Sequence, residues 1–557
     1  MDDPRDTVTS DAPDARAFPV LTDPQTARIL AHGRRRSVRA GEALIQPGDR
    51  PPFFVVLRGS LEVVRSAGAR QVIVTHRVHQ FSGESNLLTG RPSLVLVRAA
   101  EDGEVIEVAR DRLLALVQTD SELGQVLLRA LLLRHVLLID GKYGDIVVIG
   151  STHSADTLRV KEFLTRNGQP YEYVDLDRDA TAQELLDRFR VGVDDVPVLI
   201  CRGDVVLRNP SNAAIANCLG LNETLDRSAV RDLVVIGAGP AGLAAAVYGA
   251  SEGLDVLVLE SSAPGGQAGS SSRIENYLGF PTGISGLDLT GRAYAQAQKF
   301  GAHVLIANGA ARLSCAGQVY SIHMDDGDCV RARTVLIASG AQYRKPTLEN
   351  LARFEGAGVY YAATPMEAQL CGGQEIAIVG GGNSAGQAAV FLAESARRVH
   401  ILVRREGLAA TMSRYLIRRI EEHPRIQLHP RSEIVALEGD GQLQRIRWRR
   451  ADSGEVTDAE IAHVFMMTGA LPNTRWLDGC IALDQAGFIR TGSDLTRDDL
   501  NAVNWPGARS PYLLETNRAG IFAAGDVRSG NVKRVASAVG EGSIAVTFIH
   551  QVLQAAR

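Results

Sequence analysis

The chain has 557 residues, which is too long for one hydrophobic core and suggests three or four domains of roughly 150 residues each. Hydrophobic residues make up 45% and charged residues 22% of the chain, which is ordinary for a globular protein. The net charge of -4 gives no reason to expect a nucleic-acid or anionic-membrane partner.

The N-terminal residues 1–19 are acidic, contain proline and have few apolar side chains, so we expect a flexible tail. They lack the basic and apolar regions of a signal peptide. The most apolar run, "VLLRALLLRHVLLI" at residues 126–139, is too short and too charged to cross a bilayer. A cytoplasmic protein is therefore expected.

The cysteines are widely spaced along the chain, at Cys201, Cys218, Cys315, Cys329, Cys371 and Cys480. No two of them form a Cys-x-x-Cys motif, which argues against a zinc knuckle and against a local redox pair. We expect most of them to be buried as small apolar side chains. The histidines show no metal-ligand spacing, so no metal site is predicted.

Residues 20–142 alternate short β-branched runs with glycine turns at Gly41, Gly48 and Gly59, and then continue in an apolar helical pattern. This pattern predicts a small antiparallel β-barrel or jelly roll followed by helices. Together with "FSGESNLLTGRPSLVLV", the segment resembles the cyclic nucleotide-binding domain family. The resemblance implies that Glu84 would bind a ribose hydroxyl and that an arginine would pair with the cyclic phosphate.

The phosphate arginine is replaced in this chain, because Ser93 stands at its position. Losing a charge-assisted phosphate contact would cost about 1.5–3 kcal/mol of binding free energy. Arg91 or Arg98 could compensate. The other interpretation, which we favour, is a docking or dimerisation domain in which Glu84 merely caps a helix.

Residues 143–222 read as strand, helix, strand, helix, strand, strand, which predicts a small α/β sheet. They resemble the glutaredoxin and thioredoxin fold, with Pro197 in the place of the fold's cis-proline. Where that family carries redox cysteines, this chain has Ser154 and Thr157, so we expect no disulfide chemistry unless Cys201 or Cys218 serves alone. The segment would then act as an adaptor.

A dinucleotide-binding pattern begins near residue 231, in "LVVIGAGPAGLAAAVYGASEGLDVLVLE". A strand runs into Gly237, Gly239 and Gly242, a helix follows, and a second strand ends in Glu260. The glycines allow close approach of the backbone to a pyrophosphate, the helix N-terminus stabilises its charge, and the acid can bind ribose hydroxyls. This arrangement of strand, helix, strand and acid predicts a dinucleotide site.

A second copy begins at residue 375, in "EIAIVGGGNSAGQAAVFLAESARRVHILVRRE". Gly380, Gly382 and Ala385 occupy the three fingerprint positions, and Arg404 and Arg405 replace the acid at the end of the second strand. Arginines there favour the 2′-phosphate, hence NADPH over NADH, unless both are simply a solvated face.

Two nested dinucleotide folds are the plan of a pyridine-nucleotide-dependent flavoenzyme, with FAD in the first site and NADPH in the second. The motifs "GGQ", "IENYLGFP", "GVYY", "GGGNSA" and "AAGD" make residues 229–557 resemble bacterial low-molecular-weight thioredoxin reductases. The chain is therefore expected to be a multidomain α/β protein, with an FAD-binding domain at 229–343 and 469–557 and an NADPH-binding domain at 344–468.

Candidate cofactor-binding residues follow from these motifs. The fingerprints give Gly237, Gly239, Pro240, Ala241, Gly242 and Glu260 for FAD, and Gly380, Gly382, Asn383, Ser384, Ala385, Arg404 and Arg405 for NADPH. The resemblance adds Gly266, Gln267, Asn276, Asp526, Val535 and Ala536 as residues that would contact FAD.

The redox cysteines of that family are absent, because "YYAATP" puts Ala362 and Pro365 in their positions. Cys371 lies beyond them and is read as structural. Ala409 replaces a further arginine that the family uses on the 2′-phosphate. The flavin is then the reactive centre, and we name no catalytic side chain.

The leading hypothesis is an enzyme that passes hydride from NADPH to FAD and electrons from FAD directly to a small molecule or an electron-carrier protein. One rival is a disulfide reductase that uses an external thiol or Cys371. Another is a sensor without turnover that signals through the N-terminal domain. The resemblance implies a homodimer. The family rotates one domain to alternate between disulfide and NADPH, and without the two cysteines we expect this rotation to be unnecessary here.

Overall fold

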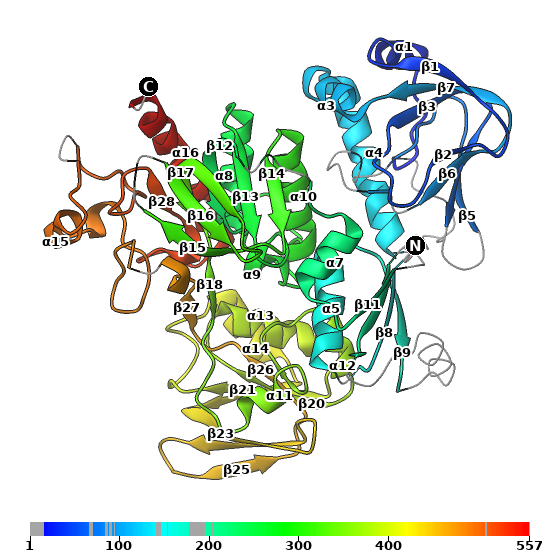
Figure 1. The fold of residues 1–557 in the computed structure, drawn as a ribbon. Coiled ribbons are helices and arrows are strands. Elements are labelled where there is room, and N and C mark those ends of the chain that lie inside the picture. Colours follow the sequence, from blue (N-terminus) through cyan, green and yellow to red (C-terminus); the bar gives the residue numbers. More distant parts are fainter. Residues whose placement is uncertain are drawn as a thin grey trace, which may run out of the picture. The chain divides into compact units, whose positions relative to one another are not determined.

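The computed structural model describes most of the chain, as drawn in Figure 1. The described residues are 16–65, 71–83, 87, 92–93, 95–140, 146–152, 154–177, 195–201, 205–223, 226, 228–315, 317, 319–477, 479–506 and 509–555. They form two compact units, one made of residues 1–149, 168–174 and 179–223 and the other of residues 150–167, 175–178 and 224–557.

The N-terminal part folds into two antiparallel sheets, with strand orders β1-β7-β3 and β2-β6-β4-β5. The antiparallel pairing was expected, and the barrel or jelly-roll arrangement of the two sheets stays a prediction. Gly41, Gly48 and Gly59 all have positive φ, the backbone conformation that tight turns between such strands require. The elements are α1 (Asp23–Leu30), β1 (Arg34–Val38), β2 (Ala43–Ile45), β3 (Phe53–Arg58), β4 (Leu61–Arg65), β5 (Gln71–His76), β6 (Leu96–Ala99), β7 (Gly103–Val108), α3 (Arg110–Thr119) and α4 (Ser121–Asp140).

A four-stranded sheet of order β11-β10-β8-β9 follows. The Val196–Pro197 bond is cis, as the resemblance to the thioredoxin fold implies. The helix expected between β9 and β10 lies outside the described residues. The elements are β8 (Ile146–Gly150), α5 (Ala155–Arg166), β9 (Glu172–Asp175), β10 (Val198–Cys201), β11 (Val205–Arg208) and α7 (Asn212–Leu219).

The first dinucleotide fold is a seven-stranded sheet of order β14-β13-β12-β17-β16-β15, with β28 paired to β17. Its central strands are parallel, and the C-terminal halves of β12 and β17 are apolar, as expected for strands covered on both faces. Helix α8 contacts both α10 and α16 (Figure 1). The elements are β12 (Val230–Ile236), α8 (Pro240–Ser251), β13 (Val256–Glu260), α9 (Gly266–Gly269), α10 (Gly286–Lys299), β14 (His303–Ile306), β15 (Ala310–Ser314), β16 (Tyr320–Met324), β17 (Cys329–Ile337), η2 (Arg475–Leu477), η3 (Gly492–Asp494), α15 (Arg497–Asn501), β28 (Ile521–Ala523), η4 (Gly525–Val527) and α16 (Val535–Ala555).

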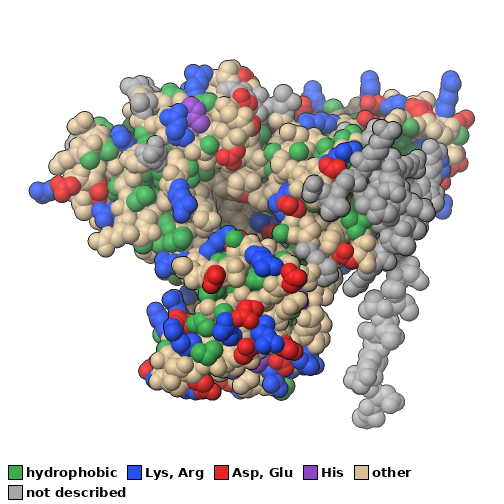
Figure 2. All heavy atoms as spheres, turned by 60° about the horizontal axis from the view of Figure 1, so that its bottom comes forward, with side chains coloured by type: hydrophobic (Ala, Val, Ile, Leu, Met, Phe, Trp, Pro, Cys, Tyr) green, Lys and Arg blue, Asp and Glu red, His purple; other side chains and the backbone are tan. Residues whose placement is uncertain are grey.

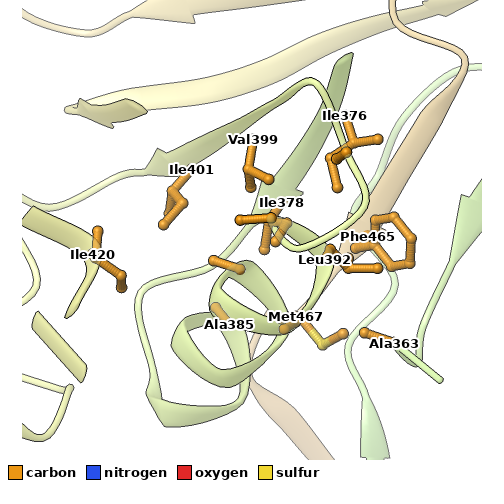
Figure 3. Packing of buried hydrophobic residues seen from close by; sticks show 14 of the residues in the cluster. Ala363, Ile376, Ile378, Ala385, Leu392, Val399, Ile401, Ile420, Phe465 and Met467 are labelled. Atoms are coloured by element: carbon orange, nitrogen blue, oxygen red, sulfur yellow. The ribbon is translucent and has the colours of Figure 1, made fainter. Parts of the chain in front are cut away.

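The second dinucleotide fold is a parallel sheet of order β19-β26-β20-β21-β22, carrying a separate three-stranded sheet β23-β24-β25. Figure 3 shows its core, where Ile376, Ile378, Ile401 and Phe465 of the strands form one cluster with Leu392 and Ala385 of α13. The elements are α11 (Leu351–Phe354), β19 (Val359–Tyr360), α12 (Pro365–Leu370), β20 (Glu375–Val379), α13 (Asn383–Leu392), β21 (Arg398–Val403), α14 (Arg414–Glu422), β22 (Ile426–Pro430), β23 (Ser432–Glu438), β24 (Arg445–Arg450), β25 (Val456–Ala459) and β26 (His463–Met466).

The two dinucleotide folds are connected by a pair of short antiparallel strands, β18 (Ala341–Tyr343) and β27 (Ala470–Pro472). The chain leaves the first sheet through β18 and returns to it through β27. The second fold is thus an insertion into the first.

The cysteines differ in part from expectation. Cys201 and Cys371 are buried, as predicted for small apolar side chains, but Cys218 and Cys329 are only half-buried, so the expectation that most cysteines are buried is wrong. Cys315 and Cys480, however, form a disulfide with a Cα–Cα distance of 6.2 Å and a sequence separation of 165 residues. No local motif announces a pair so far apart in the chain, and it was therefore not predicted.

Candidate functional site

The first glycine loop has the geometry of a pyrophosphate site. Gly237 has a φ of +100°, and a Cβ on Gly242 would lie 1.9 Å from the Gly237 carbonyl oxygen, so neither position can carry a side chain. A Cβ on Gly239, in contrast, would meet nothing within 4 Å. The middle glycine, which is the N-cap of α8, therefore exposes the backbone at the positive end of a helix.

Glu260 is buried at the end of β13 and is already fixed by the backbone. Its Oε2 accepts the Ala238 N–H at 2.8 Å, and its Oε1 accepts the Ser262 N–H at 2.8 Å. Burial raises the pKa of Glu260, and these hydrogen bonds oppose the rise. The carboxylate is thus pre-oriented beside the glycine loop, where it could accept ribose hydroxyls.

The C-terminal "AAGD" segment also reaches this loop. A Cβ on Gly525 would lie 3.1 Å from the Cβ of Ala241, so the turn carrying Asp526 touches the first turn of α8. Burial raises the pKa of Asp526, the charge of Lys533 lowers it, and the charge of Glu541 raises it. Glu541 holds this turn through the Gly525 N–H, which donates to its Oε2 at 2.7 Å.

The other predicted FAD residues are only partly brought together. Gly265 N–H donates to Ala238 O at 2.7 Å, which places the "GGQ" turn on the glycine loop. Gln267 Nε2 donates to the Ala341 carbonyl. Asn276 and Ala536 are exposed, and Val535 is half-buried at the start of α16. Among the residues that the structure describes, no hydrogen bond or ion pair joins Asn276, Val535 or Ala536 to the glycine loop.

The second glycine loop repeats the geometry. Gly380 has a φ of +146°, and a Cβ there would lie 2.3 Å from the Met467 carbonyl oxygen. Gly382, the N-cap of α13, again faces open space. Ala385 is fully buried against the sheet, while Asn383 Oδ1 accepts the Ser413 N–H at 2.7 Å.

Arg404 and Arg405 follow β21 and are both exposed. In the part of the chain that the structure describes, neither guanidinium forms an ion pair. Two exposed arginines beside a glycine loop can pair with a phosphate without first breaking another interaction. Ser384 lies next to Asn383 on the same loop, at the start of α13.

Tyr343 connects the two sites and was missed from the sequence. Burial raises the pKa of its hydroxyl, a hydrogen bond with Ser384 lowers it, and the charge of Asp526 raises it. The side chain therefore lies within electrostatic reach of one residue predicted for each cofactor. In the sequence, Tyr343 could have been noticed only because it follows "SGAQ" at the end of the first part of the FAD-binding domain.

The stretch from Ala362 to Pro365 leads into α12. Thr364 is the N-cap and forms a capping box with Glu367, while Pro365 is the first helical residue. Cys371 ends this helix and is fully buried, and burial raises the pKa of its thiol to about 11. At neutral pH this thiol is protonated and inaccessible, so it is a poor nucleophile.

The cyclic-nucleotide-like pocket is described only in part, because Glu84 and Arg91 lie outside the described residues. Ser93 is buried, and its hydroxyl donates to its neighbour's carbonyl, Val95 O, at 3.0 Å. Arg98 is ion-paired with Glu62 at 2.8 Å, so its charge is already partnered. These contacts offer no phosphate-binding arginine among the described residues of this pocket.

The surface drawn in Figure 2 carries Lys and Arg side chains interspersed with Asp and Glu, without a continuous basic stripe on that face. Among the described residues, no cluster of His, Cys, Asp and Glu has the geometry of a metal site. Across the same residues, no helix is both long enough and apolar enough to span a bilayer.

Comparisons with known proteins agree with this geometry. Residues 231–542 match the family model described as pyridine nucleotide-disulphide oxidoreductase, and residues 35–120 match the cyclic nucleotide-binding domain. The thioredoxin reductase of Streptomyces coelicolor is 32% identical over 321 residues, which cover 57% of this chain and 91% of the relative. That of Bacillus subtilis is 30% identical over 326 residues, covering 58% of this chain and 95% of the relative.

Among solved structures, Lactococcus lactis thioredoxin reductase in its FR conformation matches with a TM-score of 0.52 and 28% identity. The match covers 58% of this chain and 98% of the other. Thioredoxin reductase homologues use FAD and NADPH. The residues around Gly239 and Gly382 fit these groups, because both loops leave open space exactly where a pyrophosphate would approach a helix N-terminus.

Proposed function

Since the chain belongs to the pyridine nucleotide-disulphide oxidoreductase family, we propose that it oxidises NADPH with a bound FAD and delivers the electrons directly to an external acceptor. FAD, when bound, supplies the redox chemistry, because it can take a hydride from NADPH and release electrons onward. The protein's own residues bind and orient the two cofactors.

The residue roles follow from the geometry of the two loops. The backbone at Gly239 would hold the FAD pyrophosphate and Glu260 would accept ribose hydroxyls. Asp526, on the turn that touches the first turn of α8, would bind the same cofactor. The backbone at Gly382 would hold the NADPH pyrophosphate, and Arg404 with Arg405 would bind the 2′-phosphate.

The observation that carries the proposal is the chemistry of residues 362–371. Ala362 and Pro365 cannot form a disulfide, and Pro365 instead begins α12. Cys371, the nearest cysteine in the sequence, is fully buried and has a raised thiol pKa. This stretch therefore supplies no redox-active thiol, and electrons would pass from the flavin directly to an external acceptor.

An anaerobic titration of the holoprotein with NADPH tests the proposal. We expect the absorbance of oxidised flavin to be lost at one NADPH per flavin and to return when a quinone, dioxygen or an oxidised carrier protein is added. NADPH binding without loss of flavin absorbance would contradict the proposed electron path. It would favour a sensor that binds both cofactors without turnover.

A disulfide reductase remains the second candidate, because the relatives are named thioredoxin reductases. In that case a thiol would come from the substrate, from another subunit or from Cys371. Turnover of thioredoxin or of a small disulfide, lost in Cys371→Ser, would support it. A homodimer in the cytoplasm is our expectation for either candidate, and light scattering with cell fractionation tests both points.

A further inference from the structure

Helix α5 belongs to the same compact unit as the two dinucleotide folds, although it precedes them by more than sixty residues in the chain. Ser154 caps its N-terminus, with the side chain accepting the Thr157 N–H. Its apolar side chains Leu158, Val160, Phe163 and Leu164 are buried. The helix is thus firmly held along its length, and nothing in the proposed electron path requires it.

The C-terminal end of α5 is bonded to the FAD-binding fold. Arg166 Nη2 donates to the Gly266 carbonyl at 2.9 Å and to the Ala263 carbonyl at 3.5 Å. Asn167 Nδ2 donates to the Ser262 carbonyl at 3.4 Å. The Arg166 side chain is only 18% exposed, so these charge-assisted bonds are shielded from water. All three carbonyls lie in the turn that follows Glu260.

The N-terminal half of α5 packs on the NADPH-binding fold. Leu158 is part of the hydrophobic core that includes Ile378 and Ala385. At the first turn, the Cβ of Ala155 lies 2.7 Å from the position that a Cβ on Gly356 would take, so backbone and helix are in direct contact there. The two folds therefore share one helix.

A second tie joins the same two folds at another point. Arg419 of α14 is paired with Glu275 of the FAD-binding fold, with Nη1 and Oε2 2.6 Å apart. Its side chain is half exposed, so this pair alone contributes little. The hydrogen bond between Tyr343 and Ser384, at the point where the chain passes between the folds, is a third tie. The chain itself passes between the folds through β18 and β27, and two short strands alone would leave the folds free to rotate.

We propose that α5 is a strut that holds the NADPH-binding fold in one orientation relative to the FAD-binding fold. Rotation of one fold against the other would break the Arg166 bonds to Gly266 and would expose Leu158. The strut presupposes the proposed function, in which no internal dithiol has to exchange places with the nicotinamide.

Pulsed electron spin resonance on the full-length holoprotein tests the strut. Spin labels are attached to a non-native ketone residue at Arg292 on α10 and at Arg447 on β24, both exposed, so that the cysteines stay untouched. We expect one narrow distance distribution, unchanged by NADP⁺. In Arg166→Ala and in Leu158→Ala, the population at a second distance should rise about tenfold, because each variant releases one end of the helix.

Arg418→Ala is the matched control, since this exposed arginine of α14 pairs with Glu422 on the same helix and with no other acid among the described residues. It should leave the distance distribution unchanged. Flavin content and circular dichroism verify that each variant is folded, and Arg166→Ala keeps the test valid if Leu158→Ala does not fold. Two distances in the unaltered protein, with proportions that change when NADP⁺ is added, would overturn the strut. A distance distribution in Arg166→Ala as narrow as that of the control would also overturn it.

The distance measurement involves no turnover, so the two proposals fail separately. A narrow distribution in a protein whose flavin NADPH cannot reduce would support the strut and contradict the proposed function. A broad distribution in a protein whose flavin is reduced rapidly would do the opposite.

Discussion

Removing the carboxylate of Glu541 should weaken both the fold and its hold on FAD. Glu541 lies on α16 and is 14% exposed. Its Oε2 accepts the Gly525 N–H at 2.7 Å, and its Oε1 accepts Arg528 Nη2 at 2.5 Å and Nε at 3.1 Å. Gly525 immediately precedes Asp526, so this carboxylate fixes the turn that carries a predicted FAD ligand.

The expected loss depends on what replaces the carboxylate. Glu541→Ala leaves the Arg528 guanidinium, which is 17% exposed, without its partner, and breaking a mostly buried ion pair in this way costs about 3–5 kcal/mol of unfolding free energy. Glu541→Gln keeps an acceptor for the Gly525 N–H and should cost about 1–2 kcal/mol. The glutamine variant should therefore lie between the alanine variant and the unaltered protein.

Urea unfolding at a fixed concentration of free FAD measures the loss, and repeating it without FAD separates stability from binding. Glu421→Ala is the control, because Glu421 is exposed on α14, and it should change the unfolding free energy by less than about 0.5 kcal/mol. Equal unfolding free energies for Glu541→Ala and Glu421→Ala would refute the role assigned to Glu541. A loss that appears only in the presence of FAD would mean that the residue contributes to binding and not to the fold.

Three further changes test other parts of the structure. Replacing Arg404 and Arg405 together by alanine should raise the KM for NADPH by about tenfold or more and leave the KM for NADH unchanged. Initial rates with each nucleotide measure both constants. Equal effects on both would mean that the two arginines only form a solvated surface. Cys371→Ser should leave NADPH turnover unchanged while lowering the unfolding free energy by about 1–2 kcal/mol, because a hydroxyl replaces a thiol in a fully buried place; lost turnover in a folded variant would restore the thiol route. Burial, followed by the charge of His400, lowers the pKa of His429 from 6.5 to about 4. The unfolded chain therefore binds the extra proton between these pH values, and the unfolding free energy should fall as the pH falls through this window. Because the side chain is only half-buried, we expect the slope to stay well below the limit of about 1.4 kcal/mol per pH unit that one proton sets. His429→Gln should make that fall shallower in denaturation curves at pH 4.5 and 7, and an unchanged slope would contradict it.

Both glycine loops could be predicted from the sequence, because their function imposes backbone constraints that only certain residues meet. Gly237 and Gly380 have positive φ, and there is no room for a Cβ at Gly242, so the spacing of the glycines follows from the backbone geometry of the loop. The acid at Glu260 was also predictable, since it ends a strand whose length the apolar run defines. The antiparallel sheets of the N-terminal part followed from turn glycines in the same way.

The contacts between distant segments could not be predicted. Glu541, Tyr343 and Arg166 act through partners that lie on other elements, and no local pattern records which elements meet. The same limit applies to Ser93, whose hydroxyl bonds to a neighbouring carbonyl that the sequence alone cannot select. The extent of the NADPH-binding insertion and the other domain bounds stay predictions.

The disulfide between Cys315 and Cys480 joins the two halves of the FAD-binding fold on either side of the inserted NADPH-binding fold. When it is formed, the intervening chain is a covalent ring that contains the whole insertion. A protease that cuts the backbone once inside residues 316–479 would therefore yield two pieces that still migrate together without reductant and separate only after reduction. The insertion could be cut, or a new sequence could be inserted there, without releasing helix α16, which packs against α8 after the first glycine loop.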